Sequence, residues 1–202
     1  MRFLKEISTH QIEINKSIFI SILYPLNAIE DISKSLEDAK LKYPKGNHYC
    51  YASIYGKNGE QQQASDDGEP SRTAGVPILE VLKHHDLTNV LCVVVRYFGG
   101  IKLGSGGLVR AYTKAAADLI NKSKFYTKKS VPVYEITFPY SLVNTIDHHY
   151  KEKVIILQKT FLENVTYQVI LLDLEQSLFN DLKHQLISIK ELEPKVLYID
   201  EL

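Results

Sequence analysis

The chain has 202 residues, of which 45% are hydrophobic, enough to bury the core of one large domain or two small ones. Its 24 basic and 24 acidic side chains cancel, which argues against a protein that coats a polyanion over its whole surface. No segment approaches the ~18 to 20 uncharged apolar residues of a membrane span, and the N-terminus lacks the apolar centre of a signal peptide. We therefore expect a soluble cytosolic protein.

Charge and glycine are distributed unevenly along the chain. Residues 1–130 hold 18 Lys and Arg against 13 Asp and Glu, whereas residues 131–202 hold 6 against 11. All four arginines and all ten glycines lie in the first part. This asymmetry predicts two domains, and a lysine-rich link places their boundary between residues 1–126 and 127–202.

Near the N-terminus the sequence predicts a hairpin and a helix. Apolar and polar residues alternate over residues 10–24 on both sides of Asn15-Lys16, which is typical of a β-hairpin. Asn27 followed by Glu30 resembles a capping box, and apolar residues at helical spacing continue to Pro44. The helix is therefore expected to turn one face toward the core.

The next segment predicts a strand and then a long loop. Residues 49–55 read as a strand and residues 56–59 as a turn. Residues 60–74, EQQQASDDGEPSRTA, are polar and show no apolar periodicity. Loops longer than roughly 12 residues in compact domains are often functional, so this loop is the first place to look for a site.

A glycine-rich stretch then joins a strand to a helix. A short helix is predicted from Pro77, and the apolar run 90–95 predicts a strand buried on both faces. The stretch RYFGGIKLGSGGLVR, residues 96–110, follows directly. Apolar residues at helical spacing then predict a helix from Leu108 to about Asn121.

The second part of the chain shows a different order of elements. Strands and helices are predicted in the order βαββαβ, with strands at 131–138, 154–157, 165–172 and 196–199, a short helix from Ser141 and a helix at 175–187. This order is typical of the ferredoxin-like arrangement, in which two helices cover one face of an antiparallel sheet. The expected fold class is therefore α+β, an N-terminal α/β domain followed by a ferredoxin-like domain.

The glycine-rich stretch matches neither common phosphate-binding motif. A P-loop needs Lys and Ser or Thr after its last glycine, and a dinucleotide fingerprint needs the spacing G-x-G-x-x-G, which these glycines do not have. Exposed N–H groups, the start of a helix and nearby cations still favour an anion site, while a tight turn explains the same glycines. The candidate binding residues are Arg96, Gly99, Gly100, Lys102, Gly104, Ser105, Gly106, Gly107 and Arg110.

The acidic loop supplies a second set of candidates, Asp66, Asp67 and Glu69, with Arg72 and Thr73 beside them. Clustered carboxylates bind Mg²⁺ or shift one another's pKa for acid–base chemistry. They equally cap helices or pair with arginines such as those of the glycine-rich stretch. Because the spacing fits no EF-hand, we predict no metal.

The histidines and cysteines give little sign of catalysis. His48 and Cys50 share one face of a predicted strand, and His48 joins the candidate binding residues. Cys50 and Cys92 lack the spacing of redox or zinc motifs and are expected to be buried thiols. His84-His85 and His148-His149 have no partner at ligand spacing. We therefore assign no catalytic residue and no cofactor.

Several stretches together resemble a known family. DDGEPSRTAGVPILEVL, VVVRYFGG and GGIKLGSGGLVRAY, in that order and spacing, with HYCYA upstream, resemble the two-domain members of the IMPACT family of the bacterial YigZ type. The resemblance runs from about His48 to Tyr112. It implies an N-terminal domain with the fold of the second domain of a ribosomal small-subunit protein, also seen in the fourth domain of elongation factor G. It also implies a ferredoxin-like C-terminal domain similar to that factor's fifth domain.

The resemblance also implies a role connected with translation. The eukaryotic relatives oppose activation of a kinase that phosphorylates an initiation factor, and the bacterial members have a proposed nucleic-acid or ribosome role. The family's acidic loop usually reads DDGEP-x-GTAG, with glycine where this chain has Arg72.

We therefore predict a non-catalytic cytosolic protein of translational or stress regulation that binds RNA, the ribosome or a translation-related protein. Arg72, Arg96, Lys102 and Arg110 would contact phosphate, and the backbone of residues 99–107 would donate N–H groups. One alternative is a metal-assisted enzyme that uses Asp66, Asp67 or Glu69 on a small phosphorylated or nucleotide substrate. Another is a protein-binding adaptor that does not bind nucleic acid.

Overall fold

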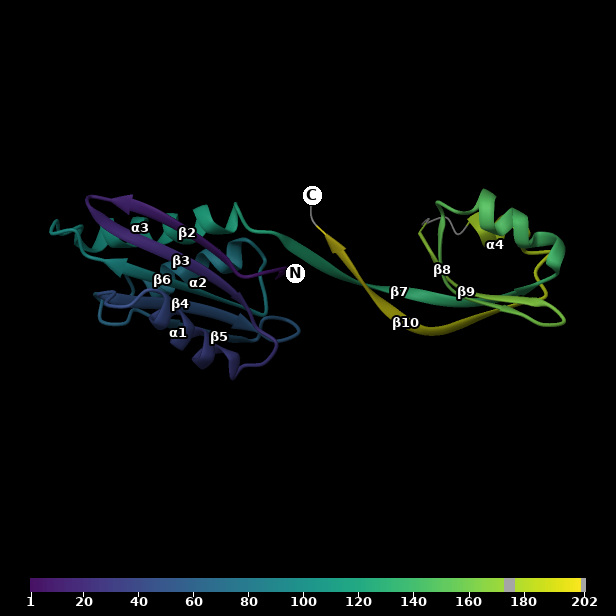
Figure 1. The fold of residues 1–202 in the computed structure, drawn as a ribbon, viewed down its shortest axis with the longest axis horizontal. Helices are drawn as coiled ribbons and strands as arrows, with labels where there is room; N and C mark the ends of the chain where they lie inside the picture. Colours follow the sequence, from purple (N-terminus) through teal and green to yellow (C-terminus); the bar gives the residue numbers. More distant parts are fainter. Residues whose placement is uncertain (173–176, 201–202) are drawn as a thin grey trace. The chain divides into compact units, whose positions relative to one another are not determined.

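The computed structural model describes residues 1–172 and 177–200, and the chain divides into two compact units (Figure 1). Met1–Thr127 together with Ile199 and Asp200 form the first unit, and Lys128–Tyr198 form the second. The division into domains 1–126 and 127–202 stays a prediction. Among the described residues, no helix is long and apolar enough to cross a membrane.

The first unit is built on a five-stranded antiparallel sheet with the strand order β2-β3-β6-β4-β5. Its strands are β2 Ser8–Ile14, β3 Ser17–Pro25, β4 His48–Tyr55, β5 Gln61–Ser65 and β6 Val90–Tyr97. Asn15 and Lys16 have φ angles of 49° and 64°, the left-handed backbone of a two-residue hairpin turn, so the predicted hairpin is confirmed. β6 is central and buried from Val90 to Arg96, as its apolar run predicts.

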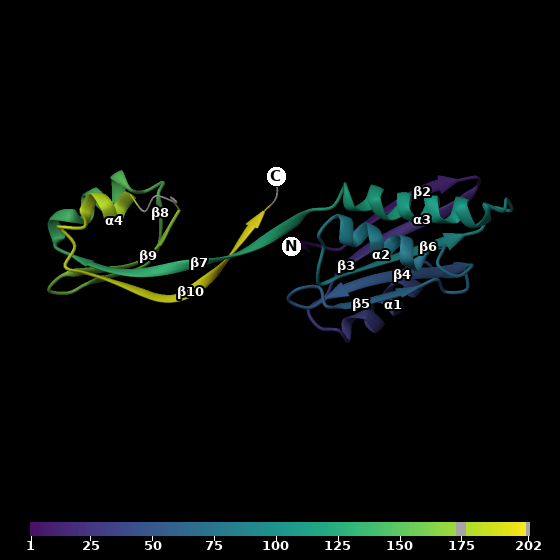
Figure 2. The ribbon, with the colours of Figure 1, turned by 180° about the vertical axis from the view of Figure 1, so that it is seen from behind.

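Helices cover both faces of this sheet. They are α1 Asp31–Lys42, α2 Gly75–His84 and α3 Gly104–Ile120. Figures 1 and 2 show α2 and α3 along one face and α1 on the other. Ile78 and Tyr112 of the helix pair pack with Phe19 and Val94, whereas Ile32 of α1 packs against the opposite face. Because helices cover both faces of the sheet, side chains on both faces of β6 are buried, which explains its continuous apolar run.

Three local predictions for the first unit are corrected. No side chain caps α1 at Glu30; instead the Asp31 carboxylate accepts N–H groups of Asn27 and Ala28 at 3.1 and 3.0 Å. The predicted loop 60–74 contains the edge strand β5, which pairs with β4. Its QQQAS sequence is polar because an edge strand of this sheet stays exposed. α3 begins at Gly104 rather than Leu108, because glycine's poor helix propensity hides the first turn.

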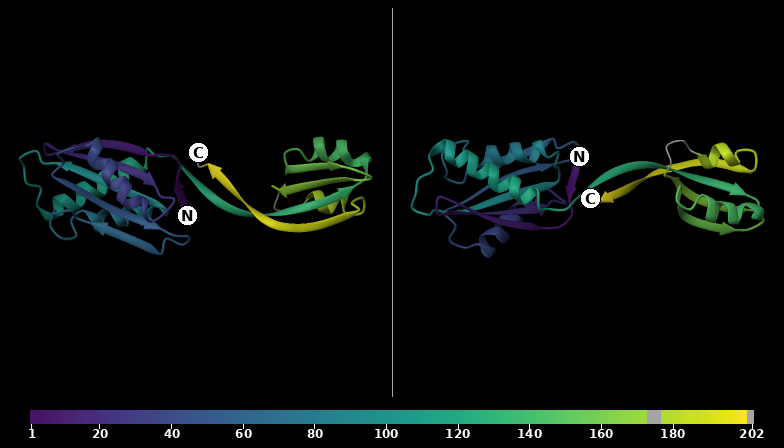
Figure 3. Two further views of the ribbon diagram at one scale, coloured as in Figure 1. Left: turned by 60° about the horizontal axis from the view of Figure 1, so that its bottom comes forward. Right: turned by 90° about the horizontal axis from the view of Figure 1, so that it is seen from above.

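The short strand β1 consists of Arg2–Leu4, and β7 consists of Phe125–Phe138. β1 pairs with the first three residues of β7, Phe125 to Thr127. The second unit contains most of β7 together with β8 Val154–Phe161, β9 Val165–Leu171 and β10 Ser188–Asp200, in the order β10-β7-β9-β8 (Figure 3). Its helical segments are Tyr140–Leu142, Thr145–His149 and α4 Ser177–Leu182.

This strand order is the ferredoxin-like one, so the predicted α+β class is confirmed. Ile136, Ile146 and Tyr167 bury one face of the second sheet against the helical segments. α4 is shorter than the predicted helix 175–187, whose first two residues lie outside the described residues. β10 is longer than the predicted strand 196–199, because most of its residues are exposed and an exposed strand needs no apolar alternation.

Candidate functional site

The acidic loop and the glycine-rich stretch meet where β6 ends. His48 at the start of β4 lies opposite Arg96 near the end of β6, and Ser65 at the end of β5 lies opposite Tyr51. This register returns the chain to the same end of the sheet after β5. A cavity of about 370 Å³ is found there, lined by Glu69, Pro70, Arg96, Phe98, Lys102, Leu103, Gly104, Ser105 and Leu108.

A buried ion pair forms the inner wall of this cavity. Arg96 Nη1 lies 2.6 Å from Glu69 Oε1, and the two side chains are 6% and 4% exposed. The Tyr112 hydroxyl donates to the same oxygen at 2.8 Å, and burial raises the pKa of Tyr112, which keeps this donor protonated. The charge of Arg96 is thus compensated within the fold, and its prediction as a direct phosphate contact stays a prediction.

Asp66 acts as a hub of backbone hydrogen bonds. Its Oδ1 accepts the N–H groups of Ala74 and Gly75 at 2.9 and 2.8 Å, and its Oδ2 accepts that of Arg72 at 2.7 Å. Burial alone would raise the pKa of Asp66, but these three donors outweigh it and hold the pKa below its usual value. Asp66 therefore caps the N-terminus of α2, the structural alternative left open for the acidic cluster.

Other polar groups in and beside the acidic loop also form hydrogen bonds within the protein. Asp67 Oδ2 accepts the Tyr49 N–H at 2.6 Å, and His48 Nδ1 lies 2.8 Å from the Asp67 carbonyl oxygen. Burial raises the pKa of Cys50 to about 12, and its thiol donates to the Asp66 carbonyl at 2.9 Å. Cys50 is therefore a protonated structural thiol at neutral pH rather than a nucleophile.

The carboxylates do not form a metal site. Asp66, Asp67 and Glu69 each face different protein donors, and within residues 1–172 and 177–200 no three His, Cys, Asp or Glu side chains are placed to hold a metal ion. The geometry thus gives no support to a metal-assisted reaction at this loop.

The start of α3 is positively charged, in contrast to the carboxylates of the acidic loop. Gly104, Ser105 and Gly106 are exposed in its first turn, where N–H groups have no partner within the helix. This turn contains no acidic residue, and no side chain of the described residues is found to cap it. Lys102 is exposed just before the helix, and Arg110 Nη1 lies 3.7 Å from the place of a Cβ on Gly106. The helix dipole and two cations therefore create a positive edge.

The two interpretations of the glycines apply to different residues. A Cβ on Gly99 would lie 2.0 Å from the Lys16 backbone, and its N–H donates to Ser17 Oγ at 3.2 Å, so Gly99 serves close packing against the β2–β3 turn. Gly100 has a φ of 86° and serves the turn itself. Gly104, Gly106 and Gly107 begin α3 and keep its first turn free of bulky side chains.

An exposed aromatic ring lies on the rim of the cavity. Phe98 is 47% exposed, its N–H donates to Asn47 Oδ1 at 2.8 Å, and its ring lies 5.5 Å from the Arg96 guanidinium carbon. Tyr97 differs from it, because its hydroxyl donates to the Pro44 carbonyl at 3.0 Å and holds it to the fold. Phe98 is therefore the ring available to a ligand.

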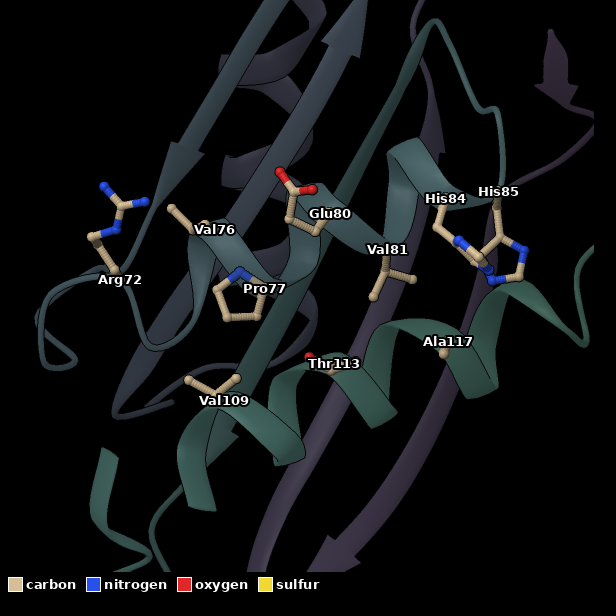
Figure 4. A pocket seen from close by; sticks show the side chains of 10 residues that line it. All are labelled: Arg72, Val76, Pro77, Glu80, Val81, His84, His85, Val109, Thr113 and Ala117. Carbon is tan, nitrogen blue, oxygen red and sulfur yellow. The ribbon is translucent and has the colours of Figure 1, made fainter. Parts of the chain in front are cut away.

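Arg72 and Thr73 are not among the residues that line this cavity. Arg72 is exposed and lines a separate groove between α2 and α3, shown in Figure 4. Thr73 is buried, and its hydroxyl donates to the Pro70 carbonyl at 2.6 Å. Their assignment to the phosphate site therefore stays a prediction. The groove itself was not predicted from the sequence. A signal that could have indicated it is Val109, an exposed apolar residue outside the buried stripe of α3.

Replacing Arg72 with glycine is expected to raise the free energy of unfolding by about 1 kcal/mol. Arg72 has a φ of 62°, a left-handed conformation that costs a side chain with a Cβ about 1–3 kcal/mol. Urea unfolding followed by circular dichroism measures the change, with Arg72→Ala as the matched control because alanine keeps the Cβ. Equal stability of the two variants would contradict this account of the loop.

Comparisons with known proteins agree with the fold. The sequence model of the Impact N-terminal domain matches residues 15–120. The chain is 36% identical over 178 residues to the IMPACT family member YvyE of Bacillus subtilis, covering 88% of this chain and 82% of that protein. It is 38% identical over 127 residues to YigZ of Escherichia coli, covering 62% and 61%. A crystal structure described as a hypothetical protein superposes with a TM-score of 0.60 at 26% identity, over 96% of this chain and 97% of that one.

Proposed function

The chain belongs to the IMPACT family, and we propose that it acts in translational or stress control by binding RNA at the start of α3. The observation that carries this proposal is the positive edge: an uncapped first turn without acidic residues, flanked by Lys102 and Arg110. The link to translation comes from the family resemblance of the acidic and glycine-rich stretches.

Each part of the edge has a chemical task in this proposal. A phosphate accepts N–H groups of the first turn, where glycines let its oxygens approach the backbone closely. Lys102 and Arg110 neutralise its charge. Phe98 stacks on an unpaired base, which requires single-stranded RNA because paired bases do not expose their faces. Glu69 and Arg96 support the wall of the cavity and do not contact phosphate.

The proposal is tested by fluorescence anisotropy with a labelled 12-nucleotide single-stranded RNA, a matching duplex and purified ribosomal subunits over a salt series. We expect binding that weakens steadily as salt rises, because phosphate neutralisation releases counterions. Absence of binding to all three at low salt would contradict the proposal. It would leave the protein-binding adaptor as the function to pursue.

The double variant Lys102→Ala/Arg110→Ala is expected to bind single-stranded RNA at least about tenfold more weakly, a loss of about 1.4 kcal/mol. The slope of log affinity against log salt should fall by about 1 to 2, because two phosphate contacts are lost. The measurement is the same anisotropy series.

A charge-matched control is Lys34→Ala/Lys57→Ala. Lys34 is on α1, on the other face of the sheet, and Lys57 is in the turn after β4, at the end of the sheet away from Tyr97. This control removes the same net charge from distant positions. Equal losses in the two double variants would mean that binding follows overall charge and would refute the assigned edge.

A further inference from the structure

A second, independent surface lies along α2 and α3. The groove between these helices has a volume of about 540 Å³ (Figure 4). Its lining residues are Arg72, Val76, Pro77, Glu80, Val81, His84, His85, Val109, Thr113 and Ala117. Val109, Thr113 and Ala117 are spaced by four residues and form one row along α3, about 12 Å long at 1.5 Å per residue.

The groove is an open surface rather than an internal cavity. Val109 is 36% exposed, and Thr113 and Glu80 are exposed as well. Side chains at four-residue spacing form the ridges and grooves into which a neighbouring helix packs. The side chains of Thr113 and Ala117 are small and project little from α3, so a third helix can approach closely. A helix placed in this groove would meet rows of side chains from both α2 and α3.

The charged residues beside the groove indicate which charge a partner surface should carry. Glu80 is held by Lys83 at 3.0 Å, and Asp118, next to the α3 row, is held by Lys114 at 2.7 Å. Arg72 forms no ion pair with any carboxylate of the described residues. His84 and His85 lie at the opposite end, as Figure 4 shows. Arg72 is an exposed cation whose charge helps to hold the pKa of Asp66 low, although the two groups form no ion pair. The apolar floor therefore has an exposed cation at one end, and the complementary surface is apolar with a carboxylate beside it.

We propose that this groove binds an acidic amphipathic helix of a partner protein. Apolar residues of that helix at positions i, i+4 and i+7 occupy the row formed by Val109, Thr113 and Ala117. α2 and α3 run in the same direction, with their N-terminal ends near Arg72 (Figure 4). The partner helix lies antiparallel to both, so that its negative C-terminal end and its carboxylates face Arg72.

The test uses a displayed library of randomised 16-residue helical peptides, selected on the intact chain. Selected peptides are expected to be net acidic and to carry apolar residues at helical spacing. Thr113→Trp fills the groove and should weaken binding at least tenfold, whereas Ser33→Trp, at an exposed position of α1 on the other face of the sheet, should not. Arg72→Gly, which relieves the strained backbone, should also weaken binding because it removes the cation. Val109→Glu, at an exposed position, provides a second block that repels an acidic helix.

Three results would overturn the proposal. The first is a selection that yields no peptides, or only basic or non-helical ones. The second is binding that persists in both Thr113→Trp and Val109→Glu. The third is a dimer in sedimentation velocity that Thr113→Trp dissociates, since this would assign the groove to a second copy of the chain. RNA binding is tested separately with the Lys102→Ala/Arg110→Ala variant, so failure of the groove proposal and failure of the proposed function can be told apart.

Discussion

Replacing Glu69 with alanine is expected to lower the free energy of unfolding by about 3–5 kcal/mol, because the substitution leaves a buried guanidinium without its counter-charge. Arg96 is 6% exposed in its side chain, and Glu69 Oε1 at 2.6 Å is its carboxylate partner. Tyr112 loses the acceptor of its hydroxyl in the same variant. The chain has no tryptophan, so urea unfolding is best followed by far-ultraviolet circular dichroism.

The control for this prediction is Glu80→Ala. Glu80 is exposed and forms a surface ion pair with Lys83 of the same helix, so its loss should change stability by no more than about 0.5 kcal/mol. The double variant Glu69→Leu/Arg96→Met should recover much of the loss, because two apolar side chains replace both buried charges. A Glu69→Ala loss below about 1 kcal/mol would mean that water reaches Arg96.

Replacing Asp66 with alanine is expected to cost about 2–3 kcal/mol. Three backbone N–H groups, at the start of α2 and in the loop before it, lose a charged acceptor together. Asp67→Ala is the matched control, because that carboxylate accepts one backbone N–H, from Tyr49, and its loss should cost about 1 kcal/mol. Similar losses in the two variants would contradict the role of Asp66 as a hub.

The same carboxylate gives the stability a pH dependence. The pKa of Asp66 is lower in the folded chain than in the unfolded one, so its contribution is present above the unfolded value and is lost as pH falls. Unfolding measured between pH 7 and about pH 3 should therefore show wild type and Asp66→Ala converging in acid, below the usual carboxyl pKa of about 4. A stability gap that stays constant over this range would contradict the assignment.

Patterns that are local in sequence predicted much of the fold. The Asn15-Lys16 turn and the apolar run of β6 carry their structure in a few neighbouring residues. β5 could not be predicted, since an exposed edge strand of glutamines has no apolar alternation. The start of α3 was hidden because glycine weighs against a helix even where it forms the first turn.

The site was less predictable than the fold. The acidic loop and the glycine-rich stretch were both identified as candidates, but their mutual geometry depends on pairing between distant residues. Glu69 and Arg96 are 27 positions apart, and sequence alone left open whether the carboxylate faces a metal, a substrate or an arginine. Arg72 was grouped with the phosphate contacts because it is close in sequence, whereas its backbone turns it toward the α2–α3 groove.

The buried pair of Glu69 and Arg96 also restricts how the chain can misfold. β6 is a nearly uniform apolar strand, VLCVVV, and such a strand can shift by two residues against β4 with little change in the apolar area it buries. A shift of that kind would carry Arg96 away from the carboxylate and leave a bare guanidinium in the interior, at a cost of several kcal/mol. This buried polar contact therefore favours a single alignment of the sheet among several that hydrophobicity alone would tolerate.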